Sequence, residues 1–154
     1  ILLALSIAAA LGPGLGNLIV AVGIGAIPGY ARIVRASILS VKQMEYIEAA
    51  RSIGASDFRL IVKHILPNCL APIIVQATMS IAIAILSAAS LSFLGLGITP
   101  PTPEWGSMLS AGRAYIRDFW PVVTFPGIMI MITVFAFNIL GDGLRDALDP
   151  KLKV

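Results

Sequence analysis

The sequence predicts an all-α integral membrane protein, a polytopic helical bundle with about four spans and short helices between two of them. Of its 154 residues, 58% are hydrophobic and 12% are charged, whereas an average soluble domain carries about 25% charged residues. Several apolar runs approach the roughly 20 residues that a helix needs to cross a bilayer. The net charge of +3 comes from basic residues that flank apolar runs, so it indicates membrane orientation and not nucleic-acid binding.

Four apolar segments are the expected spans. The first, about residues 1–11, is a partial span, because such a helix rises only about 17 Å against a hydrocarbon core of about 30 Å. The chain begins inside this run with no basic leader, so we interpret it as the C-terminal part of a longer polypeptide. The other spans are expected at about 18–37, 70–96 and 121–141, and Pro28 predicts a kink in the second.

The segment at about 97–120 connects the last two spans. It begins with a proline-rich turn, and a short amphipathic helix is predicted over 107–117. Trp105 and Trp120, on either side of this helix, suit a membrane–water interface. We therefore expect this connection to lie at the membrane surface.

The other connection, about residues 40–68, is a charged, helix-forming island in a chain that is otherwise mostly hydrocarbon. Ser40 to Gln43 has the form of a capping box and predicts a helix from Val41 to about Ile53. Gly54 suits the left-handed position that follows the end of a helix.

A second short helix is predicted after this glycine turn. Ser56 or Asp57 can cap its beginning, and Pro67 would stop the helix or start the next one. Helical spacing places three apolar residues on one face of this helix: Phe58, Ile61 and Ile65. The island is therefore expected to be two short helices joined at a glycine corner.

The distribution of basic residues predicts which side of the membrane the island faces. Nine of the eleven Lys and Arg residues fall in the island, the helix before it and the C-terminal tail, which lie on one side. The opposite side has only Arg113 and Arg117. The positive-inside rule therefore places both the island and the C-terminus in the cytoplasm.

Several kinds of chemistry are excluded by the sequence. It contains no phosphate-binding Gly-rich loop followed by Lys and Ser or Thr, and no zinc-protease or serine-hydrolase motif. His64 and Cys69 are the only histidine and cysteine, so no metal site or bound cofactor is expected, and His64 is interpreted as a packed or capping residue. The spans hold almost no ionisable residues, which disfavours an ion-coupled transporter or a membrane-embedded enzyme.

The island combines apolar residues with charged ones and a defined bend. A loop that only rests on lipid headgroups needs none of these features. A surface that docks into a partner's groove needs all of them, because apolar anchors supply binding energy and surrounding charges set orientation. A channel or structural subunit without energy coupling stays open as an alternative.

The island also resembles a known signature. Glu48-Ala49-Ala50, then Gly54, then Leu66-Pro67 is similar to the motif of permease subunits of ATP-binding-cassette (ABC) importers, whose fold is of the type I kind. The general pattern has an aliphatic residue where this chain has His64, which leaves that position's packing role open.

Five further stretches resemble the dipeptide/oligopeptide/nickel branch of these permeases, and within it the second, C-type, of two unlike subunits. They are Leu11-Gly12-Pro13-Gly14, Pro28-Gly29-Tyr30-Ala31-Arg32, residues 91–97, residues 101–108 and residues 141–150. The resemblance covers nearly the whole chain. It implies the membrane of a bacterial or archaeal cell as the location.

The resemblance further implies that the island couples this chain to an ATPase and that ATP hydrolysis occurs on separate subunits. Its coupling residues would be Glu48, Ala49, Ala50, Arg51, Gly54, Leu66 and Pro67. We hypothesise that Glu48 makes a polar contact to the ATPase and that Gly54 permits the bend. The implied partners are a homologous permease, two ATP-binding subunits and an extracytoplasmic solute-binding protein, within a lipid bilayer.

The C-terminal tail and the cargo leave alternatives open. The charged tail residues are Asp142, Arg145, Asp146 and Asp149. They could pair locally at i,i+3 and i,i+4 spacing or dock against the ATPase or the island. The branch handles peptides, nickel and other small solutes, and no residue pattern in this chain selects among them.

Overall fold

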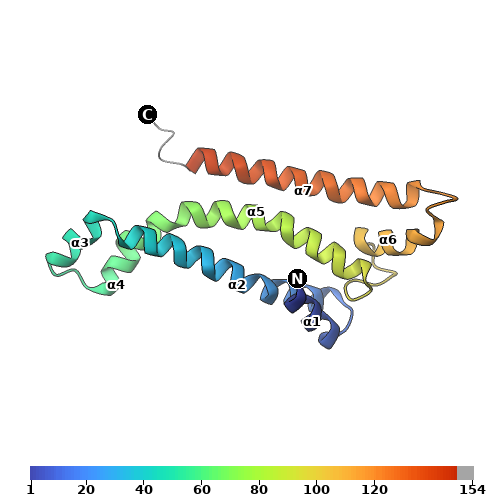
Figure 1. Ribbon diagram of the computed structural model, residues 1–154, viewed down its shortest axis with the longest axis horizontal. Helices are drawn as coiled ribbons and strands as arrows, with labels where there is room; N and C mark the ends of the chain where they lie inside the picture. The colour runs from blue at the N-terminus through green and yellow to red at the C-terminus, as the bar shows by residue number, and fades with distance from the viewer. Residues whose placement is uncertain (149–154) are drawn as a thin grey trace. The chain divides into compact units, whose positions relative to one another are not determined.

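The structure is a computed structural model, and it describes residues 1–148 of the chain. All regular secondary structure within these residues is helical, which confirms the predicted all-α class (Figure 1). The elements are α1 (Leu2–Leu11), α2 (Leu15–Lys42), α3 (Glu45–Ser52), α4 (Asp57–Arg59), the π-helical turn η1 (Leu60–Ile65), α5 (Leu66–Phe93), α6 (Trp105–Gly112), the 3-10 turn η2 (Arg113–Tyr115) and α7 (Pro121–Leu148).

Among residues 1–148, three helices are long and apolar enough to cross a membrane: α2, the continuous helix from Asp57 to Phe93, and α7. The helix α1 is apolar but has only 10 residues. The helices α2 and α7 continue past their expected spans into charged sequence, to Lys42 and Leu148, and the third long helix begins in charged sequence at Asp57 and ends at Phe93. A proline lies inside each of them without ending it, so Pro28 does not interrupt α2.

The chain forms two compact units, and α2, α5 and α7 each contribute residues to both. The first unit comprises Ile1–Ile27 and Met79–Ile139. Its core joins α1 and α2 to the end of α5 through small and medium side chains, namely Ala4, Ala8, Leu18, Ala21 and Leu91. A Cβ added at Gly25 would lie 2.9 Å from the Cβ of Ala4, so the two helices approach closely because glycine occupies this position.

The end of α5 is held by a buried polar contact in the same unit. Ser92, only 2% exposed, accepts a hydrogen bond on its Oγ from the amide of Ile98 at 3.1 Å. The carbonyl of Gly97, the residue before Ile98, accepts a hydrogen bond from the amide of Gly14 at 2.9 Å. These two bonds tie the turn after α5 to the turn between α1 and α2.

The helix α6 begins at Trp105 and ends at Gly112, so the prediction of a helix over 107–117 is wrong at both ends. Glu104 caps its beginning, and the chain continues from Gly112 as the 3-10 turn η2. Gly106, in the first turn, lies against the backbone of α5, because a Cβ added there would sit 2.7 Å from the Cα of Ala89. Glycine thus lets α6 rest directly on α5.

The second unit, within the described residues, comprises Pro28–Thr78 and residues 140–148. Its core cluster is formed by Ile47 of α3, Ile65 of η1 and Cys69 of α5. Val41 and Ile73 pack against this cluster. The island predicted at 40–68 therefore packs around a core that it shares with α5.

Candidate functional site

The helix α3 begins at Glu45, and the capping box predicted at Ser40–Gln43 is not formed. Ser40 lies inside α2, and the N-cap of α3 is Met44, which makes no side-chain capping bond. No proline or glycine separates Ala31 from Lys42, so nothing stops α2 before the pattern that resembles a cap. The acidic residues of the first turn, Glu45 and Glu48, lie near the positive end of the helix dipole, where they are favourable.

Gly54 ends α3 as predicted. Its φ is +83°, in the left-handed region. The amide of Gly54 donates to the carbonyl of Arg51 at 3.0 Å, and the amide of Ala55 donates to the carbonyl of Ala50 at 3.2 Å. This pair of bonds is a Schellman motif, so the glycine corner is a defined turn.

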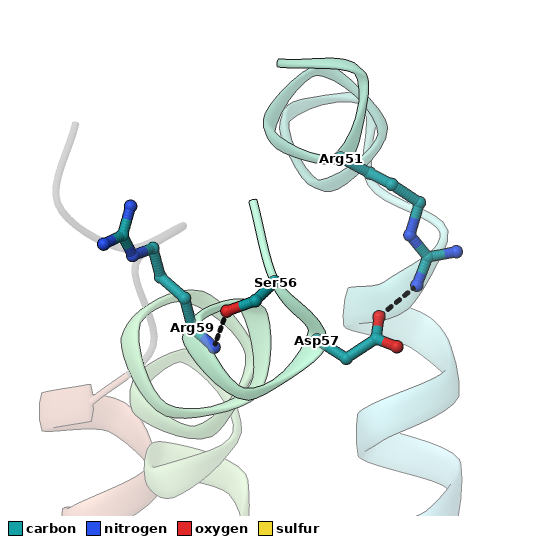
Figure 2. Close-up of polar contacts among 4 residues, drawn as sticks. All are labelled: Arg51, Ser56, Asp57 and Arg59. Carbon is teal, nitrogen blue, oxygen red and sulfur yellow. Dashed lines mark hydrogen bonds and ion pairs between the residues drawn. The ribbon is translucent and has the colours of Figure 1, made fainter. Parts of the chain in front are cut away.

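The start of α4 is capped by Ser56, also as predicted. Its Oγ accepts a hydrogen bond from the backbone amide of Arg59 at 3.4 Å. Figure 2 shows this cap together with the side chain of Arg51, which reaches from α3 to the carboxylate of Asp57 at 3.2 Å. The ion pair closes the corner between the two helices, although both side chains are largely exposed, 58% and 83%.

The corner presents apolar side chains to the outside. Ile53 is 86% exposed and Phe58 is 77% exposed, and charged residues stand beside them at 51, 57 and 59. We call residues 45–59, with this apolar tip, the α3–α4 projection. Exposed apolar groups of this size rimmed by charges are typical of a protein-binding surface.

The prediction that Phe58, Ile61 and Ile65 share one face is wrong. Phe58 and Ile61 are exposed, whereas Ile65 is 8% exposed and belongs to the core. The reason lies in η1, where the amide of Leu66 donates to the carbonyl of Ile61, five residues back. A π-helical turn holds one residue more than an α-helical turn, so α-helical spacing does not carry across it from Phe58 to Ile65.

Pro67 lies at the second position of α5, immediately after η1. It does not stop the helix, which runs on to Phe93. Proline has no amide to donate and its ring collides with the carbonyl four residues back in a regular α-helix, and the residues that precede Leu66 and Pro67 form a π turn in place of a regular α-helical turn.

The residues predicted to couple to a partner occupy three places. On α3, Glu48, Ala49 and Arg51 are exposed and Ala50 is half-buried. Leu66 and Pro67 are exposed at the start of α5, and Gly54 lies in the corner between α3 and α4.

An open groove of about 300 Å³ brings Glu48 and Arg51 together with residues that the sequence analysis did not single out. Its lining comprises Leu39, Lys42, Gln43, Ile47, Glu48 and Arg51. Lys42 and Gln43 enter this group because α2 extends as far as α3. The helical continuity of 31–42 is the sequence signal that could have placed them there.

The charged tail residues extend α7. Asp142, Arg145 and Asp146 lie in its last turns and are exposed. No ion pair joins these three within residues 1–148, where the Arg51–Asp57 pair is found. The structure therefore does not support local pairing among the three described residues. Asp149 lies outside the described residues.

The fold and the site together define a class: a helical membrane protein in which a capped two-helix projection with an apolar tip leads directly into a long apolar helix. The chain belongs to the family described as the binding-protein-dependent transport system inner membrane component, which matches residues 1–154. This membership, with the three apolar helices, makes it a multi-pass inner-membrane protein.

Named relatives cover nearly all of this chain. The di/tripeptide transport system permease protein DppC of Pseudomonas aeruginosa is 54% identical over 153 residues, 99% of this chain and 50% of the relative. A putative peptide transport system permease protein of Brucella suis is 55% identical over 154 residues, which are 100% of this chain and 52% of the relative. The glutathione transport system permease protein GsiD of Escherichia coli O1:K1 is 56% identical over 153 residues, which are 99% of this chain and 50% of the relative. The chain spans about half the length of these relatives.

Proposed function

We propose that this chain is part of a transmembrane permease subunit of an ABC importer, and that the α3–α4 projection receives the movement of a cytoplasmic ATPase subunit. The observation that carries the proposal is the build of the projection. A Schellman turn at Gly54 and a side-chain cap at Ser56 hold two helices at a fixed corner, and the exposed Arg51–Asp57 ion pair spans it. That corner presents Ile53 and Phe58 to a partner.

The tip has the chemistry of a docking anchor. Burial of an aromatic or aliphatic side chain such as Phe58 or Ile53 supplies roughly 1.5–3 kcal/mol each. The charges at Arg51, Asp57 and Arg59 would surround that anchor and set the orientation of the partner. Glu48, exposed on α3 and lining the groove beside Lys42, is available for a polar contact to the same partner.

The base of the projection can transmit movement. Ile47 of α3 packs against Ile65 and Cys69, which belong to η1 and α5. The helix that begins at Asp57 continues to Phe93 without a break. A displacement of the tip would therefore reach an apolar helix through packed side chains, as a mechanical lever between an ATPase and a transport pathway requires.

The cargo we propose is peptides or related small solutes. Support comes from the relatives, which are named as permease proteins of di/tripeptide, peptide and glutathione transport systems. Nickel or another small solute is the second candidate, from the branch that the sequence resembles.

The partners proposed are a homologous permease that forms a heterodimer, two ATP-binding subunits and an extracytoplasmic solute-binding protein. The chain itself would bind no cofactor and hydrolyse no ATP. We further propose that the island and the C-terminus lie on the cytoplasmic side; the support is the concentration of basic residues around the island.

Co-purification and transport by the full-length permease complex in proteoliposomes test the proposal. Phe58→Asp and Ile53→Asp should reduce the amount of ATPase that co-purifies by at least tenfold and abolish ATP-driven uptake. Met44→Ala, which changes a 48%-exposed apolar side chain outside the tip, is the matched control and should retain both. Wild-type amounts of ATPase and normal uptake in the two Asp variants would contradict the proposal.

A channel or structural subunit without energy coupling is the rival function. It predicts that no ATPase co-purifies even with the unaltered complex. The same preparation therefore separates the two functions before any variant is made.

A further inference from the structure

The α3–α4 projection is joined to α5 through the single π-helical turn η1. We propose that the extra residue of this turn sets the phase of the projection, that is, its rotational position about the axis of α5. Coupling to the ATPase depends on that residue being present. This inference rests on the proposed function, because it concerns how the same projection is oriented relative to α5.

The spacing of the buried residues carries the argument. Along this helix the buried positions are Leu60, Ile65 and Cys69, and Ile73 packs against the cluster that contains Ile65 and Cys69. Ile65, Cys69 and Ile73 recur every four residues, as on one face of an α-helix. Leu60 and Ile65 are five apart, and in a regular α-helix at about 100° per residue they would point about 140° away from each other.

The π turn resolves this mismatch. With hydrogen bonds that reach back five residues, a π turn holds more residues than an α-helical turn, so Leu60 and Ile65 lie nearer to the same side than α-helical spacing would place them. Leu60 is 1% exposed and Ile65 is 8% exposed, as expected if both point inward. Between them, Ile61 and Val62 are 53% and 47% exposed.

The phase matters to the projection because α3 packs on this turn. Ile47 of α3 lies in the same cluster as Ile65, and α3 contacts η1. Leu60 follows α4 directly. Removal of one residue from η1 would turn Leu60, and the tip residue Phe58 with it, by about 100° relative to Cys69.

The sequence that follows η1 favours a π turn at this place. Pro67 lacks an amide and cannot complete the regular bond to the carbonyl four residues back. The side chain of Asn68 donates a hydrogen bond to the carbonyl of His64 at 2.6 Å. This carbonyl, near the end of the turn, thus has a side-chain partner. The π conformation is therefore encoded locally as well as by the packing of Leu60.

Deletion of Val62 in the full-length permease complex tests the proposal, because Val62 is an exposed residue of η1. The deletion should convert the turn to regular α-helix and lower ATP-driven uptake at least tenfold, with the protein still inserted in the membrane. Val62→Ala, which keeps the residue count, is the matched control and should transport like the unaltered complex. Insertion of one alanine after Val62 is a second variant with the same expected loss, in case the deletion variant does not accumulate.

A second measurement reports the phase itself. In a Cys69→Ala background, Leu60→Cys should resist a maleimide at normal length and react at least tenfold faster in the Val62 deletion. Unaltered uptake in the length variants, or a Cys at 60 that stays protected in them, would overturn the inference. Failure of the proposed function is recognised separately, because then the tip variants Phe58→Asp and Ile53→Asp leave the bound ATPase unchanged.

Discussion

The carboxylate of Glu104 accepts a hydrogen bond from the amide of Ser107 at 2.7 Å, and the hydroxyl of Ser107 donates to the carbonyl of Glu104 at 2.8 Å. This reciprocal pair fixes the first turn of α6. The same turn brings Gly106 against the backbone of α5 at Ala89. The cap therefore determines where α6 begins and also how it rests on α5.

Replacement of Glu104 by Ala should loosen this turn. Loss of a side-chain N-cap costs about 1 kcal/mol, which corresponds to roughly fivefold faster local opening. Hydrogen exchange at the amide of Ser107, measured in the purified full-length permease, is the appropriate readout. Glu104→Gln keeps an acceptor oxygen and should show a smaller change; an exchange rate unaffected by Glu104→Ala would refute the capping role.

The close approach of α6 to α5 leads to a second prediction, Gly106→Ala. The added Cβ has no room beside the carbonyl of Ala89, so the permease should lose about 1–3 kcal/mol of stability. Gly23→Ala is the control, because a Cβ at this helical glycine meets nothing within 4 Å and should be neutral or stabilising by up to about 1 kcal/mol. Thermal inactivation in detergent compares the two, and equal midpoints would exclude the tight contact.

Local signals in the sequence predicted the corner of the projection well. Gly54 and Ser56 act through bonds to residues at most five positions away, and such short-range chemistry is visible in the residue order. Composition likewise revealed the apolar helices, because length and hydropathy alone decide whether a helix can span a bilayer.

Other features depend on packing and could not be predicted from the residue order. The face of Ile65 was mispredicted because helical spacing assumes α geometry, whereas Leu60–Ile65 form a π turn. The contact of Gly106 with Ala89 joins residues of two different helices. The roles of Glu48 and the tail carboxylates depend on partners and stay predictions.

The third prediction concerns Gly54, whose left-handed backbone has open space around it. Gly54→Val should leave membrane insertion intact and abolish ATP-driven uptake, because a β-branched residue is strongly disfavoured at positive φ. Gly54→Asn is the matched control, since Asn tolerates this conformation, and it should retain most of the uptake. Normal uptake by the Val variant would show that the bend is dispensable.

The fourth prediction is that the Arg51–Asp57 ion pair adds little to stability. Its two side chains are 58% and 83% exposed, and exposed pairs contribute about 0–1 kcal/mol. A double-mutant cycle with Arg51→Gln and Asp57→Asn, followed by chemical unfolding, should give a coupling energy in this range. A coupling energy well above 1 kcal/mol would mean that the pair, and not the two caps, holds the corner.

The final prediction is the side of the membrane on which the projection lies. Cys69, the only cysteine, is 1% exposed, so the unaltered protein should label slowly with a membrane-impermeant maleimide and supplies a low background. Phe58→Cys should then label from the cytoplasmic side only, and Tyr115→Cys, at a position 59% exposed, from the opposite side only. The basic residues that surround the projection are the physical reason, because positively charged loops are retained in the cytoplasm. Labelling of Phe58→Cys in intact cells from outside would invert the topology and remove the α3–α4 projection from the reach of any cytoplasmic ATPase.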